Sequence, residues 1–164
     1  MLIFLAVILV ALDLLLVWFM LRGAPYVPTR KITVDKIVDL AGNIDGKKMI
    51  DIGSGDGRLV IAFAQKGAQA TGIEILPPLV NLSRKKIQEA GLEDRAKVIW
   101  QDMWKTDFSP YDVLTVFGIV HVMPTLAKKI RREMKPGSKV ISLSFKFPHW
   151  PIKEDRDGIY LYEV

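Results

Sequence analysis

The sequence predicts an α/β fold in which a doubly wound, mostly parallel sheet forms one domain. Short apolar runs alternate with amphipathic segments of helical spacing from residue 48 to residue 145. A glycine-rich turn separates the first apolar run from the first amphipathic segment. Alternating strands and helices are typical of parallel sheets, whose ligands bind beyond the carboxyl ends of the strands. The length of 164 residues allows one such domain with a short appendage.

The composition excludes several kinds of site. The chain has no cysteine and two histidines, so it offers no disulfide, no thiolate ligand and little basis for a metal cage. We therefore expect no metal. The formal net charge of +5 is too small an excess to indicate a nucleic-acid partner, and none is expected.

The N-terminal segment has the length and apolarity of a membrane span. Residues 2–21 are apolar except for Asp13. A helix of about 20 residues spans about 30 Å, the thickness of the hydrocarbon layer. Asp13 costs about 2.5 to 3.5 kcal/mol on the insertion scale, and the many Leu, Ile, Val and Phe residues outweigh it at about 0.3 to 0.6 kcal/mol each. We predict a transmembrane helix that anchors the chain over residues 1–22.

The charges beside this segment predict its orientation. No charged side chain precedes the span, whereas Arg22, Arg30, Lys31 and Lys36 follow it. Positive residues favour the cytoplasmic side. We expect a single-pass membrane protein whose domain, residues 23–164, lies in the cytoplasm. A cleaved signal peptide is disfavoured because it would have a basic start and a shorter apolar stretch.

The elements of the domain follow in order. Residues 23–28 contain two prolines and a glycine and predict an extended linker or lid. Helical spacing then begins near Thr29, with Thr33 as the expected N-cap. The connection 147–158 is expected to be long and to help form the pocket of the acceptor substrate. Further helices are predicted over 57–66, 78–90 and 124–134, and strands over 48–52, 69–75, 96–101, 112–117, 139–145 and 159–163.

The glycine-rich turn predicts the ligand. Its glycines at 53 and 55 let a ligand approach the backbone, and the following helix presents free N–H groups. In the dinucleotide fingerprint the third glycine stands three positions after the second, whereas Gly57 comes two after Gly55. Asp51 would repel a pyrophosphate but would attract an ammonium group, and S-adenosylmethionine carries one.

Two further acidic residues stand at strand ends. Glu74 ends the second predicted strand, about 20 residues beyond the turn, where a carboxylate can accept hydrogen bonds from the ribose hydroxyls. Asp102 follows the third strand and can accept the adenine amino group. Together with the turn, these residues indicate a binding site for S-adenosylmethionine.

The turn reads D-x-G-x-G-x-G and, with the acidic strand end and the turn Gln101-Asp102-Met103, resembles the class I, seven-strand S-adenosylmethionine-dependent methyltransferases. The resemblance implies a compact, Rossmann-like methyltransferase sheet. The chain is most similar to the membrane-anchored mitochondrial protein-lysine methyltransferases that modify the ADP/ATP carrier and the c subunit of ATP synthase, and to their broad-specificity archaeal relatives. It lacks an Arg- and Ser-rich transit peptide, so the anchor suits a prokaryotic plasma membrane at least as well. The closer similarity rests on Pro25-Tyr26-Val27-Pro28-Thr29, Gly53-Ser54-Gly55-Asp56-Gly57-Arg58, Phe117-Gly118 and Phe145-Lys146-Phe147-Pro148-His149-Trp150.

The chemistry of lysine methylation points to aromatic residues. Presenting a lysine of pKa near 10.4 as the free amine at neutral pH costs about 4.6 kcal/mol. Apolar walls lower that cost because they desolvate the charged form. We expect Tyr26, Phe117 and Trp150 to form these walls as the catalytic residues. The predicted cofactor-binding residues are Asp51, Gly53, Ser54, Gly55, Asp56, Glu74, Ile75, Asp102, Met103 and Phe117.

The most favoured function is therefore transfer of a methyl group from S-adenosylmethionine to lysine side chains of a protein in or near the membrane. The segment Phe117-Gly118-Ile119-Val120 disfavours glutamine and adenine acceptors, since their enzymes usually carry Asn/Asp-Pro-Pro-Tyr/Phe there. Two alternatives remain open. The acceptor could be a small amphiphile such as a lipid headgroup or quinone precursor, or the domain could bind the cofactor without turnover. The protein substrate, the number of methyl groups, the oligomeric state and any role of Asp13 are left open.

Overall fold

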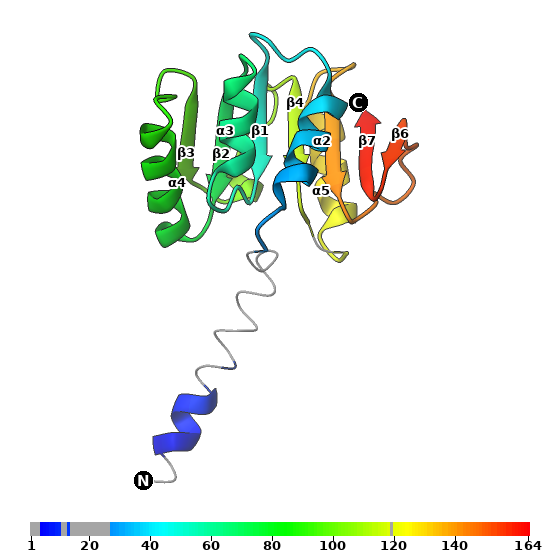
Figure 1. Cartoon of the computed structure of the whole chain (residues 1–164). Helices are drawn as coiled ribbons and strands as arrows, with labels where there is room; N and C mark the ends of the chain where they lie inside the picture. The colour runs from blue at the N-terminus through cyan, green and yellow to red at the C-terminus, as the bar shows by residue number, and fades with distance from the viewer. Residues whose placement is uncertain (1–3, 11–12, 14–26, 119) are drawn as a thin grey trace.

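The computed structural model describes residues 4–10, 13, 27–118 and 120–164. A seven-stranded sheet has the order β3-β2-β1-β4-β5-β7-β6 (Figure 1). The first five strands are parallel, and the last two pair antiparallel at one edge. The strands are β1 (Lys48–Ile52), β2 (Gln69–Glu74), β3 (Ala96–Trp100), β4 (Val113–Val116), β5 (Lys139–Leu143), β6 (Glu154–Arg156) and β7 (Ile159–Glu163).

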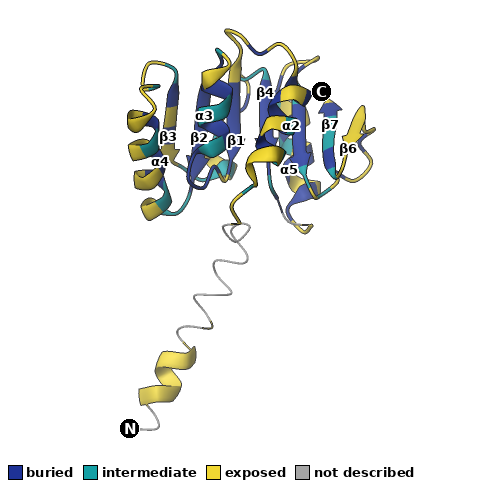
Figure 2. Ribbon diagram, in the orientation of Figure 1, coloured by how far each residue is buried: buried dark blue, intermediate teal, exposed yellow. Residues whose placement is uncertain are grey.

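Helices cover both faces of the sheet, as a doubly wound fold requires (Figure 1). One buried cluster joins the sheet to α2, α3 and α4, and the other joins it to α5. Figure 2 shows the strands buried and the outer sides of the helices exposed. The helices are α2 (Lys31–Ala41), α3 (Arg58–Gln65), α4 (Pro77–Glu89), α5 (Met123–Glu133) and a short 3-10 helix, η1 (Met103–Lys105).

The predicted α/β class and most of the predicted elements are confirmed. The starts of α3, α4 and α5 differ by one residue from the predicted ones. The predicted N-cap of α2 is wrong, since the N-cap is Arg30 without a side-chain cap and not Thr33. The amide of Thr33 instead donates to the carbonyl of Arg30, so this residue already lies within the first turn.

A hairpin completes the sheet after β5. The predicted connection 147–158 includes β6, and β7 inserts between β5 and β6. Tyr162 on β7 is fully buried, and its hydroxyl accepts a hydrogen bond of 3.1 Å from the amide of Phe147. Trp150 packs on the same ring at 5.4 Å between centroids. Phe147 and Trp150 of the connection therefore enter the core, whereas residues 148, 149 and 151–157 are exposed.

The predicted transmembrane segment lies largely outside the described residues. Residues 4–10 are helical, and their apolar side chains are exposed. Within the described part of the chain, no helix combines the length and apolarity needed to cross a bilayer.

Candidate functional site

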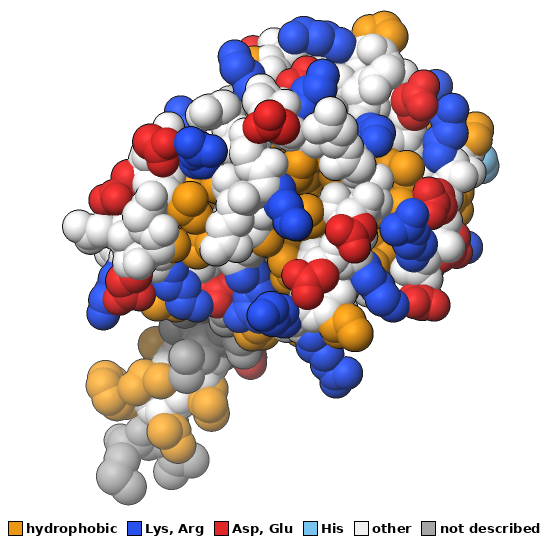
Figure 3. Space-filling model, turned by 45° about the horizontal axis from the view of Figure 1, so that its top comes forward, with side chains coloured by type: hydrophobic (Ala, Val, Ile, Leu, Met, Phe, Trp, Pro, Cys, Tyr) orange, Lys and Arg blue, Asp and Glu red, His pale blue; other side chains and the backbone are white. Residues whose placement is uncertain are grey.

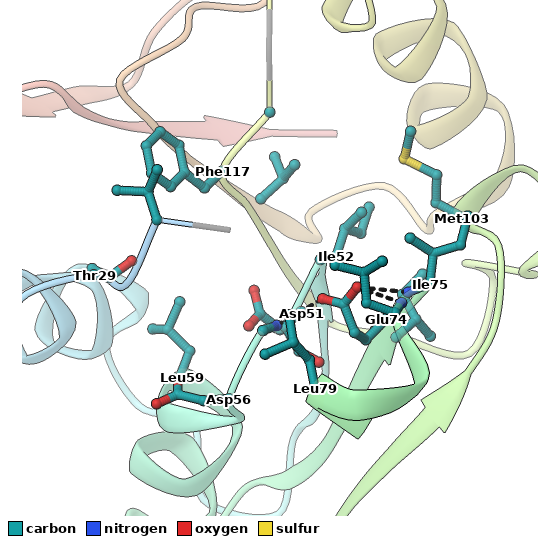
Figure 4. A pocket seen from close by; sticks show the side chains of 18 of the residues that line it. Thr29, Asp51, Ile52, Asp56, Leu59, Glu74, Ile75, Leu79, Met103 and Phe117 are labelled. Atoms are coloured by element: carbon teal, nitrogen blue, oxygen red, sulfur yellow. Dashed lines mark hydrogen bonds between the residues drawn. The ribbon is translucent and has the colours of Figure 1, made fainter. Parts of the chain in front are cut away.

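A cavity of about 380 Å³ opens at the carboxyl ends of β1, β2 and β4. Its volume lies in the range of small-molecule sites. Figure 4 shows Asp51 at its centre, with Thr29 and Phe117 on one side and Glu74, Ile75 and Met103 on the other. The cavity is thus where a doubly wound sheet places its ligand.

The glycine turn forms the floor of the cavity. Its three glycines have positive φ, at 71° for Gly53, 55° for Gly55 and 79° for Gly57. A Cβ added at Gly57 would lie 3.0 Å from the Cβ of Ser83 on α4. The hydroxyl of Ser83 donates to the carbonyl of Gly55 at 2.7 Å. Gly57 is therefore needed both for its backbone angle and for the close approach of α4.

Asp51 is a buried carboxyl group at the end of β1. Burial raises its pKa to about 7, a rise that the hydrogen bond from Thr115 opposes and the charge of Glu74 supports. The Thr115 hydroxyl donates to Oδ1 at 2.7 Å. Such a carboxyl gains most from a cationic ligand, because a nearby positive charge favours the ionised form.

Glu74 binds the turn to the end of β2. One carboxylate oxygen accepts from the amide of Gly55 at 3.0 Å. The other accepts from the amides of Ile75 at 2.7 Å and Leu76 at 2.9 Å (Figure 4). Two carboxylate oxygens offer about four acceptor positions, so capacity remains for a ligand hydroxyl.

Asp56 ties the turn to its surroundings. Burial alone would raise the pKa of Asp56, but hydrogen bonds and charges from Arg58 and Lys86 outweigh it and hold the pKa well below its ordinary value. Arg58 contacts both carboxylate oxygens of Asp56, at 2.8 and 2.7 Å. The same guanidinium donates to the carbonyl of Thr29 at 2.5 Å. Arg58 thereby holds the segment before α2 against the cavity.

The structure brings the predicted cofactor-binding residues together. All ten line the cavity. Phe117 also stacks on Phe145, with 6.1 Å between ring centroids. Tyr26 lies outside the described residues. Trp150 lies away from the cavity in the core, where its indole N–H donates to the carbonyl of Glu163 at 3.1 Å, so its position does not support a role as an acceptor wall.

Sequence reasoning missed the other lining residues. Arg58 was part of the recognised motif, yet its contact with Thr29 depends on how the chain folds back. Most of the remainder are aliphatic and indistinguishable from core residues in a sequence. The missed lining residues are Val27, Pro28, Thr29, Ile52, Arg58, Leu59, Ile73, Leu76, Leu79, Gln101, Val116, Gly118, Val122 and Leu126.

The arrangement fits S-adenosylmethionine. The buried acid at position 51 suits the ammonium group, and Glu74 suits the ribose beside it. Ile75, Leu76 and Met103 offer an apolar wall for a flat base. Among the residues that the structure describes, no cluster of three or more His, Cys, Asp or Glu could hold a metal ion.

Comparisons with known proteins agree with this geometry. Residues 51–154 match a family model described as the ANTKMT methyltransferase domain. The chain is 40% identical over 144 residues to the lysine N-methyltransferase of the ATP synthase c subunit from Rattus norvegicus, covering 85% of this chain and 66% of the relative. It is 31% identical over 150 residues to a protein-lysine N-methyltransferase of Saccharolobus islandicus, covering 85% and 93% of the two chains.

A solved structure is also similar. The crystal structure of an RNA methyltransferase from Salinibacter ruber, in complex with S-adenosyl-L-homocysteine, has a TM-score of 0.78 and 35% identity, covering 84% of this chain and 92% of that one. The chain spans between 58% and 66% of the length of the mammalian relatives it matches.

Proposed function

Since the chain belongs to the family of the ANTKMT methyltransferase domain, an S-adenosylmethionine-dependent family, we propose that it methylates the ε-amino group of lysine in a protein substrate. The observation that carries the proposal is the pairing of two buried carboxyl groups, Asp51 and Glu74, around a glycine floor. The lysine specificity is supported by the names of the relatives from rat and from Saccharolobus islandicus.

The residues of the chain have separate tasks in this reaction. The bound cofactor supplies an electrophilic methyl group on a sulfonium. Asp51 and Glu74 would hold and orient the cofactor, and the glycine floor would let it lie against the backbone. Phe117, braced by Phe145, provides an apolar wall at the cavity. That wall desolvates the approaching lysine and lowers the cost of presenting it as a free amine.

The same proposal includes a membrane tether. The apolar leader has the composition of a transmembrane helix, and residues 4–10 are helical with exposed apolar side chains. A leader in the bilayer would raise the effective concentration of substrates there. The positive residues after the leader favour a domain on the cytoplasmic side.

A labelling experiment tests the acceptor class. The full chain is incubated with tritiated S-adenosylmethionine and a membrane extract, and label is measured in protein, lipid and RNA. We expect label in protein, recovered as methyllysine after hydrolysis, and none with Asp51→Asn as the matched control. Label confined to lipid or to RNA would replace lysine with that acceptor. Cofactor affinity without any transfer would indicate a binding module.

A further inference from the structure

We propose that the edge of the domain around the cavity mouth docks on an anionic lipid bilayer, so that the acceptor lysine is taken from the headgroup layer. This inference deepens the proposed function and rests on its membrane tether. It adds the surface that meets the membrane and the class of lysine that can reach the site.

Exposed apolar side chains stand on both sides of the cavity mouth. Beside β3, Trp100 is 64% exposed and Trp104 38%. Beside β4 and the start of α2, Val120 is 71% exposed, Ile32 66% and Val27 55%. We call these five residues the rim. Isolated exposed apolar residues are ordinary, but a group around one opening marks an interaction surface.

The tryptophans suit a lipid interface better than a protein core. Trp100 is the last residue of β3, and its indole N–H donates to the carbonyl of Ile75 at 3.0 Å. That bond fixes the ring while leaving most of it in solvent. Trp104 lies in η1, directly after the strand. Tryptophan concentrates at membrane interfaces because its ring is apolar and its N–H is polar.

The chain enters the domain at this same edge. Val27 and Thr29 line the cavity, and α2 runs from there toward the opposite edge (Figure 1). Four residues, 23–26, separate the predicted span, residues 1–22, from Val27. The five Cα steps from residue 22 to residue 27 cover at most about 3.6 Å each, and therefore at most about 18 Å together. An anchor in the bilayer therefore keeps the rim close to the headgroups.

Charge favours an anionic surface. Arg30, Lys31 and Lys105 are exposed on the rim edge. Of the acids near this edge, Asp51, Asp56 and Glu74 are buried, Asp102 is half-buried and Asp157 pairs with Lys36 at 2.6 Å, whereas Asp35 on α2 and Asp107 after η1 are exposed. Figure 3 turns the opposite edge forward and shows acidic and basic side chains interspersed over it. Anionic lipid attracts exposed Lys and Arg near its surface.

Tryptophan fluorescence tests the docking. The chain has four tryptophans, at 18, 100, 104 and 150. The full-length variant Trp18→Phe removes the one in the leader, and the protein is reconstituted in vesicles of phosphatidylcholine and phosphatidylglycerol with brominated or ordinary acyl chains. We expect bromine to remove roughly half of the emission, since two of the three remaining rings lie on the rim and interfacial tryptophans reach the acyl boundary. The further variant Trp100→Phe with Trp104→Phe leaves the buried Trp150, whose emission should not change.

A charge pair provides the matched control. Lys31→Glu with Lys105→Glu should reduce the quenching, whereas Lys47→Glu with Lys66→Glu, away from the rim, should not. A chain that floats with the vesicles but shows no quenching would overturn the docking and leave the tether standing. A chain that does not float would overturn both. Methylation of a soluble lysine substrate, measured separately, reports on the lysine activity whatever the membrane result.

Discussion

Asp51 combines a structural cost with a functional use. It is 4% exposed, and burial raises its pKa to about 7. When the pKa of a carboxyl group rises on folding, the free energy of unfolding falls as the pH increases from the unfolded to the folded pKa value. The reason is that the folded state holds the proton that the unfolded state has released. Near neutral pH the unliganded domain therefore contains a buried acid that is costly to ionise, and a cationic ligand would lower that cost.

Asp51→Asn should stabilise the domain and weaken its cofactor binding. The amide removes the cost of ionising a buried acid, so the free energy of unfolding at pH 8 should rise by up to about 4 kcal/mol, with no gain near pH 4. Urea unfolding at both pH values measures this, and calorimetry measures affinity. A variant less stable at pH 8 than the native chain would contradict the raised pKa.

Cofactor affinity should depend on pH through the same group. As the pH rises from 5 toward 7, Asp51 becomes easier to ionise, and affinity should increase by at most about tenfold per pH unit before levelling off. Thr115→Val removes the hydrogen bond that favours the ionised form and should move this profile to higher pH. Calorimetric titrations from pH 5 to 8 would detect the shift. An identical profile in Asp51→Asn would assign the dependence to another group.

Glu74→Gln separates the two tasks of this residue. The amide of Gln keeps one accepting oxygen, but its NH2 group cannot accept from the backbone N–H that the other carboxylate oxygen now satisfies, so the free energy of unfolding should fall by about 1 to 3 kcal/mol. Loss of the charged acceptor should also weaken cofactor binding by about 1.5 to 3 kcal/mol. Denaturant unfolding without cofactor measures the loss of stability, and calorimetry with cofactor measures the loss of affinity. Lower stability with unchanged affinity would place the ribose elsewhere.

At the scale of elements, the glycine turn and α4 constrain each other. The close approach of Ser83 to Gly57 lets the Ser83 hydroxyl bind the turn. This packing explains why position 57 needs a glycine.

Gly57→Ala should be more destabilising than Gly46→Ala. Both glycines have positive φ, but an added Cβ at Gly46 has no neighbour within 4 Å. Gly46→Ala, the control, should lower the free energy of unfolding by about 1 to 2 kcal/mol because of the left-handed backbone. In Gly57→Ala the contact with Ser83 should add to this loss. Chemical denaturation of both variants measures the difference. Equal losses would show that α4 moves away without cost.

Most elements could be predicted from the sequence because their periodicity is strong. The bounds of β1 and β7 were predicted as observed, and the other predicted strands differ at their carboxyl ends by up to two residues, or at both ends for β4. β6 was missed because its residues, Glu154–Arg156, are all exposed and show no apolar alternation. Trp150 could not be placed because an aromatic residue in a loop looks the same whether it enters a core or a pocket.

At the scale of the whole molecule, the site was easier to predict than its surroundings. Local motifs and strand ends contain the acids and glycines that line the cavity. The contact of Arg58 with Thr29 and the position of the rim depend on packing between segments distant in the sequence. No local pattern encodes such contacts.

The leader should determine how the molecule partitions. Leu9→Arg with Val10→Arg adds two charges to the apolar segment, each costing about 2.5 to 3.5 kcal/mol on insertion. The added cost exceeds the free energy by which the apolar residues favour insertion. The full-length variant should therefore be released from membranes by alkaline carbonate, while the native chain is retained. Leu9→Ile with Val10→Leu is the control and should remain bound. Release of the native chain would contradict the tether.

The hydrogen bonds from backbone N–H groups to the Glu74 carboxylate are formed without any ligand, so the site is preorganised for an amino-acid tail and a sugar. The demethylated product, S-adenosylhomocysteine, has both groups and lacks only the transferred methyl and its positive charge. A site that binds the groups common to both compounds discriminates little between S-adenosylmethionine and S-adenosylhomocysteine. Turnover should therefore slow as the product accumulates, and the ratio of the two compounds would regulate the rate.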